Sequence, residues 1–274
     1  MVGFTGYTIT VEEGEIMKTF LGGFLIGLAN LVPGVSGGTI AVLLNLYEKI
    51  IDCLNSFLQL RFSKDSIFFL VKIAIGIGLA LLVGSKLMSY LLVFYPAFAY
   101  SAFFGLVIGM LPRFYVQIPK LRIAYVLVGA FLLLIVEVFG NVTVNLGKAS
   151  LFIGGIVAAI AMVLPGISGS LMMLIFGIYE KVIDALGSLE LSVIIPFGIG
   201  VLVGIAIAAV GMKYLLSNFK NQTYNFIFGL LLASLIKIQP FGKQHLSILT
   251  VLFVLVIMAV TTYLSFTLSK KQSQ

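Results

Sequence analysis

Long apolar runs make up most of the chain, and short polar stretches separate them. The runs are continuous and do not alternate with polar residues, so they predict buried helices rather than the strands of a membrane β-barrel. We predict three membrane spans in each half of the chain. The expected spans are 67–94, 98–111 and 121–139 in the first half, and 192–216, 224–236 and 247–268 in the second.

Two further apolar runs, near 16–46 and 150–186, are each interrupted by a similar motif. The motifs read Pro33-Gly34-Val35-Ser36-Gly37-Gly38-Thr39 and Pro165-Gly166-Ile167-Ser168-Gly169-Ser170. Proline removes a backbone donor and glycine permits the dihedral angles of a turn, so each motif breaks a helix. Each broken run therefore predicts a re-entrant helical hairpin that enters and leaves the membrane on the same side.

The motifs are part of an internal repeat, because matched positions lie 132 residues apart and the match extends to Tyr47-Glu48-Lys49 and Tyr179-Glu180-Lys181. A hairpin plus three spans crosses the membrane an odd number of times, and so do five full spans if the limbs of the hairpin cross completely. Either way, the second half starts on the opposite side. We expect an all-α polytopic protein with an inverted repeat, in one structural domain. The repeats are expected at 17–140 and 149–268, and residues 1–16 and 269–274 are expected to be cytoplasmic tails.

Composition supports an integral membrane protein, with 61% hydrophobic residues, 10% charged residues and a mean hydropathy of +1.18. A single cysteine excludes an internal disulfide. The sequence contains no His or Cys cluster for a metal and no nucleotide motif, so we expect no cofactor. The net charge of +7 comes from scattered residues, which indicates topology signals and not a nucleic-acid surface.

Basic residues in the predicted loops set the expected orientation. Ten lie on the side of the N-terminus and three on the other side, which places both termini in the cytoplasm. The ten are Lys18, Arg61, Lys64, Arg113, Lys120, Arg122, Lys213, Lys220, Lys270 and Lys271, and the three are Lys148, Lys237 and Lys243.

The two broken helices predict an anion site near the middle of the membrane. A broken helix exposes backbone N–H groups and the positive end of its dipole, and both attract an anion such as phosphate. The serines supply capping hydroxyls, and the glycines let a ligand approach the backbone. The candidate substrate-binding residues are Pro33, Gly34, Ser36, Gly37, Gly38, Thr39, Pro165, Gly166, Ser168, Gly169 and Ser170.

Other polar and small residues could have either a structural or a functional role. Gly23 and Gly27, upstream of the first motif, are best explained by close helix packing. Glu48 and Glu180 either anchor a helix at the interface, with Lys49 and Asp52 paired one turn apart, or bind a coupling proton or sodium ion. Lys86 either reaches the membrane interface or lines the path of an anionic headgroup, with Glu137 as its partner.

The doubled Pro-Gly-x-Ser-Gly motif, each copy followed by Tyr-Glu-Lys, resembles the bacterial and archaeal polyprenyl-phosphate transporter family (PopT-type). The resemblance covers about 17–268. It implies a multi-pass flippase of the bacterial cytoplasmic membrane that returns undecaprenyl phosphate, the lipid carrier of cell-wall synthesis, to the inner leaflet. By this resemblance, Ser36, Gly37, Gly38, Ser168, Gly169 and Ser170 surround the phosphate. Ser170 stands where the first copy has Gly38, so the two motifs need not contribute equally.

Two other functions remain open. The motif also resembles the Pro-Gly-x-Ser-Arg-Ser turn of membrane undecaprenyl-pyrophosphate phosphatases, but Gly37 and Gly169 stand where those enzymes have arginine. A phosphoryl transition state would then lack a neighbouring cation, so we do not expect an enzyme. An ion-coupled transporter of a small soluble anion is the other alternative, and it requires a pocket closed to lipid. The sequence does not indicate an oligomeric state.

Overall fold

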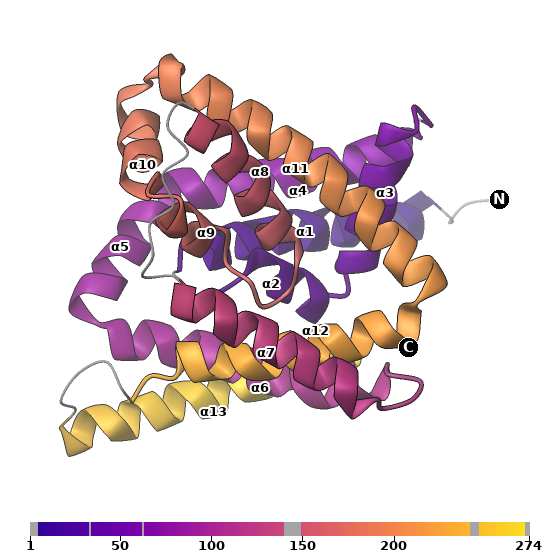
Figure 1. The fold of residues 1–274 in the computed structure, drawn as a ribbon. Helices are drawn as coiled ribbons and strands as arrows, with labels where there is room; N and C mark the ends of the chain where they lie inside the picture. The colour runs from indigo at the N-terminus through magenta and orange to yellow at the C-terminus, as the bar shows by residue number, and fades with distance from the viewer. Residues whose placement is uncertain (1–4, 33, 62, 140–148, 242–246, 272–274) are drawn as a thin grey trace.

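The computed structural model describes residues 5–271, apart from 33, 62, 140–148 and 242–246, and the described residues form helices and loops (Figure 1). The first half contains α1 (Thr5–Asn30), α2 (Gly37–Leu43), α3 (Tyr47–Leu58), α4 (Lys64–Leu79), the π-helical turn η1 (Ala80–Gly84), α5 (Ser85–Phe94), α6 (Pro96–Val116) and α7 (Ile123–Phe139). The second half contains α8 (Ser150–Val163), α9 (Gly169–Ile175), α10 (Tyr179–Ser188), α11 (Leu191–Asn218), α12 (Lys220–Ile238) and α13 (Ile248–Lys271).

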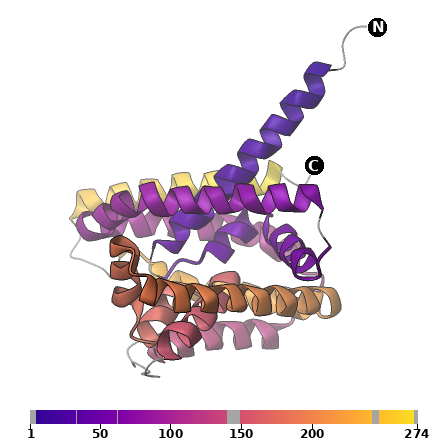
Figure 2. The same cartoon turned by 90° about the horizontal axis from the view of Figure 1, so that it is seen from above.

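The architecture is that of a helical membrane protein, as the apolar runs predict. Within the described part of the chain, four helical segments are long and apolar enough to cross a membrane. They are Lys64–Gly84, Pro96–Val116, Leu191–Asn218 and Ile248–Thr267. α1 already begins at Thr5, and its first turns extend beyond the other helices (Figure 2), while the cytoplasmic location of residues 1–16 stays a prediction.

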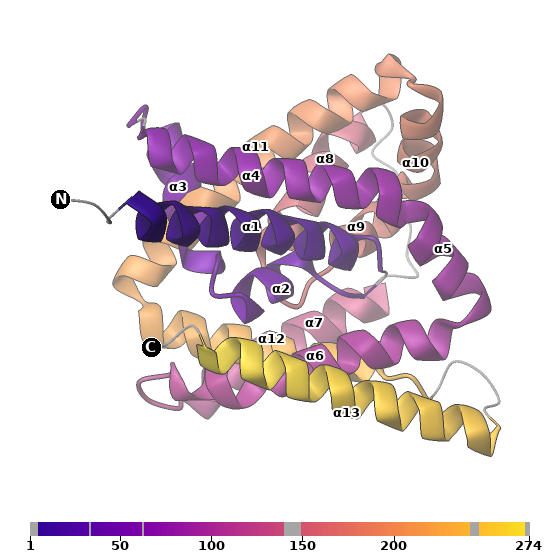
Figure 3. The same cartoon turned by 180° about the vertical axis from the view of Figure 1, so that it is seen from behind.

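Helices at matching positions in the two halves have matching neighbours. α1 packs against α4, and α8 packs against α11. A Cβ atom added at Gly23 would collide with the backbone of Ile73, and one at Gly155 would lie 2.5 Å from the carbonyl oxygen of Phe197. The packing interpretation of these glycines is therefore confirmed. α6 packs against α13, and α7 packs against α12, so each of these two pairs joins one helix of the first half to one helix of the second (Figure 3).

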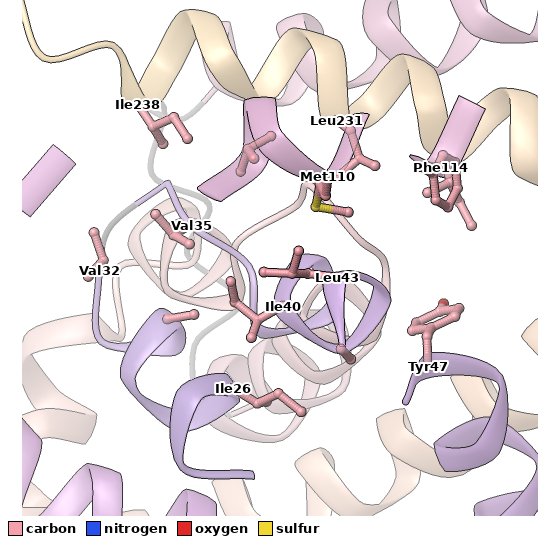
Figure 4. Close-up of a cluster of buried hydrophobic side chains, with 14 of the residues drawn as sticks. Ile26, Val32, Val35, Ile40, Leu43, Tyr47, Met110, Phe114, Leu231 and Ile238 are labelled. Carbon is pink, nitrogen blue, oxygen red and sulfur yellow. The ribbon is translucent and has the colours of Figure 1, made fainter. Parts of the chain in front are cut away.

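The short helix α2 lies inside the main apolar core. Its side chains Ile40 and Leu43 are buried among residues of both halves, including Met110 of α6 and Leu231 of α12 (Figure 4). Burial of these side chains stabilises α2, although it is too short to be stable as an isolated helix. The core therefore holds the first motif where the two halves meet.

The ends of the helices define two opposite ends of the molecule. α1 begins and α13 ends at the same end (Figures 1 and 3). α3, which follows the first broken run, lies toward this end, and α10, which follows the second broken run, lies toward the other (Figures 1 and 3). The two broken runs thus approach the centre of the molecule from opposite ends.

Candidate functional site

Each motif interrupts its helix at the expected place and with the same backbone conformation. α1 ends at Asn30 and α2 begins at Gly37, while α8 ends at Val163 and α9 begins at Gly169. Gly34 has a φ of 87° and Gly166 a φ of 92°, values in the left-handed region that favours glycine. The sequence repeat is therefore also a repeat of backbone shape.

The two breaks lie in direct contact. The backbone N–H of Gly166 donates to Thr39 Oγ1 at 2.9 Å, and Ser36 Oγ donates to the carbonyl oxygen of Leu164 at 3.2 Å. A Cβ atom added at Gly38 would lie 2.9 Å from the carbonyl oxygen of Val163. Residues that are far apart in the sequence therefore form one buried cluster between the halves.

Of the remaining candidate residues, Ser168 and Pro165 are buried in the same region, and Pro33 lies outside the described residues. The side chains of Ser36 and Ser168 are only 1% and 3% exposed. In this conformation the buried serines of the motifs are closed to solvent, and two hydrogen bonds join one break to the other.

The serines occupy the expected N-cap positions, but their hydroxyls do not cap the helices. Ser36 bonds to the other half, while Ser168 Oγ lies 2.6 Å from Ser170 Oγ. The first break is instead capped by Asn30, whose Oδ1 accepts from the Gly37 N–H at 2.9 Å. The capping role of Asn30 was not predicted, although a polar residue three positions before Pro33 in an apolar run was an available signal.

The second break is less polar than the first. Met162 occupies the position that matches Asn30, and its side chain lies against Gly169. Leu171 likewise replaces the hydroxyl of Thr39. The first break therefore has more side-chain hydrogen-bonding groups than the second, and whether the two contribute unequally to a site stays a prediction.

The structure corrects the assignment of Lys237, which is counted above among the residues of predicted loops. It lies in the last turn of α12 and not in a loop, and it is half-buried. A Cβ atom added at Gly34 would lie 2.8 Å from Lys237 Cε and 2.9 Å from Cδ. The ammonium group is one bond beyond Cε, so the second half places a positive charge beside the first break.

Glu48 lies at the start of α3, outside the four long apolar helices, and contacts the second half. Its Oε1 accepts from the Tyr224 hydroxyl at 2.6 Å and forms an ion pair with Lys220 Nζ at 3.0 Å. Partial burial raises the pKa of Glu48, but the hydrogen bond from Tyr224 and the positive charge of Lys220 outweigh this and lower the pKa below its usual value. The carboxyl group is therefore ionised at neutral pH.

The other charged candidates have different surroundings. The proposed pairing of Lys49 with Asp52 is wrong, because Asp52 pairs with Lys213 at 2.7 Å while Lys49 lies over the Phe69 ring. Tertiary contacts with α11 and α4 replace the local pair. Glu180, the counterpart of Glu48, is exposed on α10. The side chains of Lys86 and Glu137 lie outside the described part of the structure, so their coupling role stays a prediction.

Two cavities adjoin α2 and α3. The larger has a volume of about 340 Å³, is almost entirely apolar, and reaches Gly37 and Gly38 of the first break. Its walls come from both halves, from α1, α3 and α4 and from α8 and α11. The smaller has a volume of about 180 Å³ and is lined by Asn45, Tyr47, Glu48, Gln117 and Tyr224 together with apolar residues. The apolar cavity therefore touches the first break, whereas the smaller cavity lies at the other end of α2, at Val42 and Asn45.

Comparisons with known proteins place the chain in a family. The profile of a family described as undecaprenyl phosphate translocase-like matches residues 26–252. A polyprenyl-phosphate transporter of Vibrio cholerae is 31% identical over 246 residues, which cover 84% of this chain and 80% of that protein. A polyprenyl-phosphate transporter of Staphylococcus aureus is 32% identical over 242 residues, covering 80% of this chain and 85% of that protein. No solved structure matches the chain significantly. The chain therefore belongs to the undecaprenyl phosphate translocase-like family, which confirms the resemblance carried by its doubled motif.

Proposed function

We propose that this protein carries polyprenyl phosphate across the bacterial cytoplasmic membrane and handles the phosphate at its two breaks. The names of the two relatives support the substrate class. Undecaprenyl phosphate is the proposed lipid, and its return to the inner leaflet for another round of envelope synthesis is the proposed role. The protein acts without hydrolysing its substrate.

The observation that carries this proposal is the contact between the breaks. The Ser36 hydroxyl and the Gly166 N–H, which bond to the opposite half, are donors of the kind that bind phosphate oxygens. When the halves part, these donors become available to a phosphate between them. The helices α2 and α9 have only seven residues each, so their dipoles attract an anion less strongly than those of long helices. Lys237 supplies the positive charge that the motifs themselves lack.

The apolar cavity is the proposed place for the isoprenoid chain near the headgroup. It reaches the first break at Gly37 and Gly38, and at its outer edge Ala74 of α4 is exposed. A phosphate is costly to place in hydrocarbon, whereas the tail can remain in lipid. A headgroup site with an apolar opening beside it suits a lipid better than a small soluble anion.

The proposed membrane arrangement is an inverted repeat with two re-entrant hairpins and both termini in the cytoplasm. The opposite placement of α3 and α10 supports it, and so does the matching packing of α1 on α4 and of α8 on α11 (Figure 1). Coupling to a proton or a sodium ion through Glu48 or Glu180 stays a prediction.

Transport by purified protein in liposomes tests the proposal. We expect wild type to move the headgroup of undecaprenyl phosphate between leaflets, and Ser36→Ala/Ser168→Ala to slow it at least about tenfold, the effect of losing one charge-assisted hydrogen bond. Ser101→Ala is the matched control, because Ser101 is also fully buried but bonds within its own helix to Phe98 O at 2.7 Å. The proposal fails if wild-type vesicles move the headgroup no faster than protein-free vesicles.

A further inference from the structure

We propose that the smaller, polar cavity is a second headgroup subsite, which holds the phosphate monoester of the lipid between the breaks and the end of the molecule where α1 begins. The cavity lies between the α2–α3 turn and the facing parts of α6, α11 and α12. This inference rests on the proposed transport of polyprenyl phosphate and adds a place where the headgroup pauses.

The buried hydroxyl of Tyr47 points to a missing ligand. Tyr47 is 6% exposed, and its hydroxyl has no hydrogen-bond partner among the described residues. The ring extends from the start of α3 toward Phe114, which also lines the polar cavity (Figure 4). A buried hydroxyl without a partner is unfavourable, so this group is suited to donate to a molecule in the cavity.

The carboxylate of Glu48 shows which groups at this cavity can hold an anionic oxygen. It accepts from the Tyr224 hydroxyl and from Lys220, which are the donors that a phosphate oxygen would need. The carboxylate thus stands in for the phosphate. A headgroup that enters must take over these two donors and move Glu48 aside.

The charges around the cavity favour a phosphate over a metal cation. Lys220 already places an ammonium group at the Glu48 carboxylate, and Lys213 lies close enough to lower the pKa of Glu48 further, although it pairs with Asp52. Arg113 lies beside an adjoining small cavity formed by α2 and α6. With three cations and two carboxylates in this region, an added anion is better accommodated than an added cation.

Tyr47 also joins the two cavities, because it lines both the polar one and the apolar one. A ligand that fills both must have a polar head and an apolar tail. A phosphate in the polar cavity and an isoprenoid chain in the apolar one meet this condition, with Tyr47 at the boundary. A free inorganic phosphate would use only the polar part.

Binding of farnesyl phosphate to the purified protein in detergent, followed by calorimetry, tests the subsite. We expect Tyr47→Phe and Lys220→Met each to weaken binding about five- to tenfold, because each removes one donor to a charged oxygen. Glu48→Gln should strengthen binding about three- to tenfold, because it removes the competing negative charge. Tyr263→Phe and Lys64→Met, at exposed positions outside the cavity, should leave the affinity unchanged. The melting temperature of Tyr47→Phe should not fall, because its hydroxyl has no partner to lose, and this separates lost binding from misfolding.

Binding of farnesyl phosphate, farnesol and inorganic phosphate, taken together with the transport assay, separates failure of the subsite from failure of the proposed function. Farnesol and inorganic phosphate should bind at least about tenfold more weakly than farnesyl phosphate, since each lacks one part of the ligand. The subsite is refuted, and the transport proposal survives, if all three cavity variants bind like wild type while Ser36→Ala/Ser168→Ala still slows transport at least about tenfold. Weaker binding by Glu48→Gln would also refute it, because Glu48 would then be a ligand and not a competitor. If wild type neither prefers farnesyl phosphate over farnesol nor transports undecaprenyl phosphate, the proposed function itself fails.

Discussion

Gly38 leaves no room for a side chain, because the backbone of the opposite half passes directly beside it. An added Cβ atom would lie 2.9 Å from the Val163 carbonyl oxygen and 3.1 Å from that of Met162. We expect Gly38→Ala to push the breaks apart and destabilise the protein by about 1–3 kcal/mol. Thermal unfolding in detergent measures this as a lower melting temperature.

Gly211→Ala is the matched control for this substitution. Gly211 lies inside α11 with nothing within 4 Å of an added Cβ atom. Alanine there should leave the free energy of unfolding unchanged or raise it by up to about 1 kcal/mol, so the melting temperature should not fall. If both variants melt at the wild-type temperature, the close contact of the breaks is not the state present in solution.

Thr39 provides a second test at the level of single residues. Thr39→Val keeps the shape of the side chain but leaves the buried N–H of Gly166 without its acceptor, which should cost about 1–3 kcal/mol. Thr267→Val removes an exposed hydroxyl that bonds within its own helix to Leu264 O, so it should change stability little. A denaturation midpoint for Thr39→Val that equals the control would contradict the bond between the breaks.

At the level of helices, α3 and α11 join the two halves on the side of the N-terminus. Asp52 on α3 and Lys213 on α11 form an ion pair whose partners are about half exposed, and such a pair adds at most about 1 kcal/mol. A covalent link at these positions should hold the two halves together far more strongly than the ion pair does. We expect Asp52→Cys/Lys213→Cys, joined by a short bifunctional thiol reagent, to hold the halves together and reduce transport at least about tenfold.

The two single-cysteine variants treated with the same reagent are the controls, and both should keep wild-type transport. The buried Cys53 is replaced by alanine in all of them so that the reagent has no other target. If the linked protein transports at the normal rate, the halves do not need to part between α3 and α11.

Much of the helix pattern follows from local features of the sequence. A Pro-Gly step followed closely by a Ser-Gly step removes a backbone donor and permits a turn, so the break before Gly37 and its repeat before Gly169 were predictable. A lone proline does not have this effect, since Pro112 lies inside α6 and Pro196 inside α11. The apolar runs likewise predicted helices such as α7 and α11 closely. The start of α1 at Thr5 was missed, because polar residues at a chain end carry no apolar pattern.

Contacts between helices that are distant in the chain could not be predicted from the sequence. Nothing local indicates that Lys237 reaches Gly34 or that Tyr224 bonds to Glu48, because these contacts depend on how α12 crosses the first half. The predicted pair of Lys49 and Asp52 failed for the same reason, since Lys213 of α11 offers Asp52 a closer partner. The candidate residues of the two motifs could be grouped from the repeat, but their direct contact could not.

The whole molecule has an orientation that labelling can test. Arg61 follows α3 and Ser188 ends α10, and both are exposed. In a Cys53→Ala background, we expect a cysteine at position 61 to react with a membrane-impermeant thiol reagent only after the cytoplasmic side is opened. A cysteine at position 188 should react in intact cells. Labelling of both positions from the same side would contradict the inverted arrangement.

The most direct test of the central claim compares a lipid phosphate with free phosphate in the same proteoliposomes. Headgroup translocation of undecaprenyl phosphate and uptake of inorganic phosphate are followed in parallel, with and without the protein. We expect the protein to speed lipid translocation at least about tenfold and to leave phosphate uptake unchanged, because the proposed headgroup site lies beside an apolar cavity that suits a lipid tail. Faster uptake of inorganic phosphate with no movement of the lipid would contradict it.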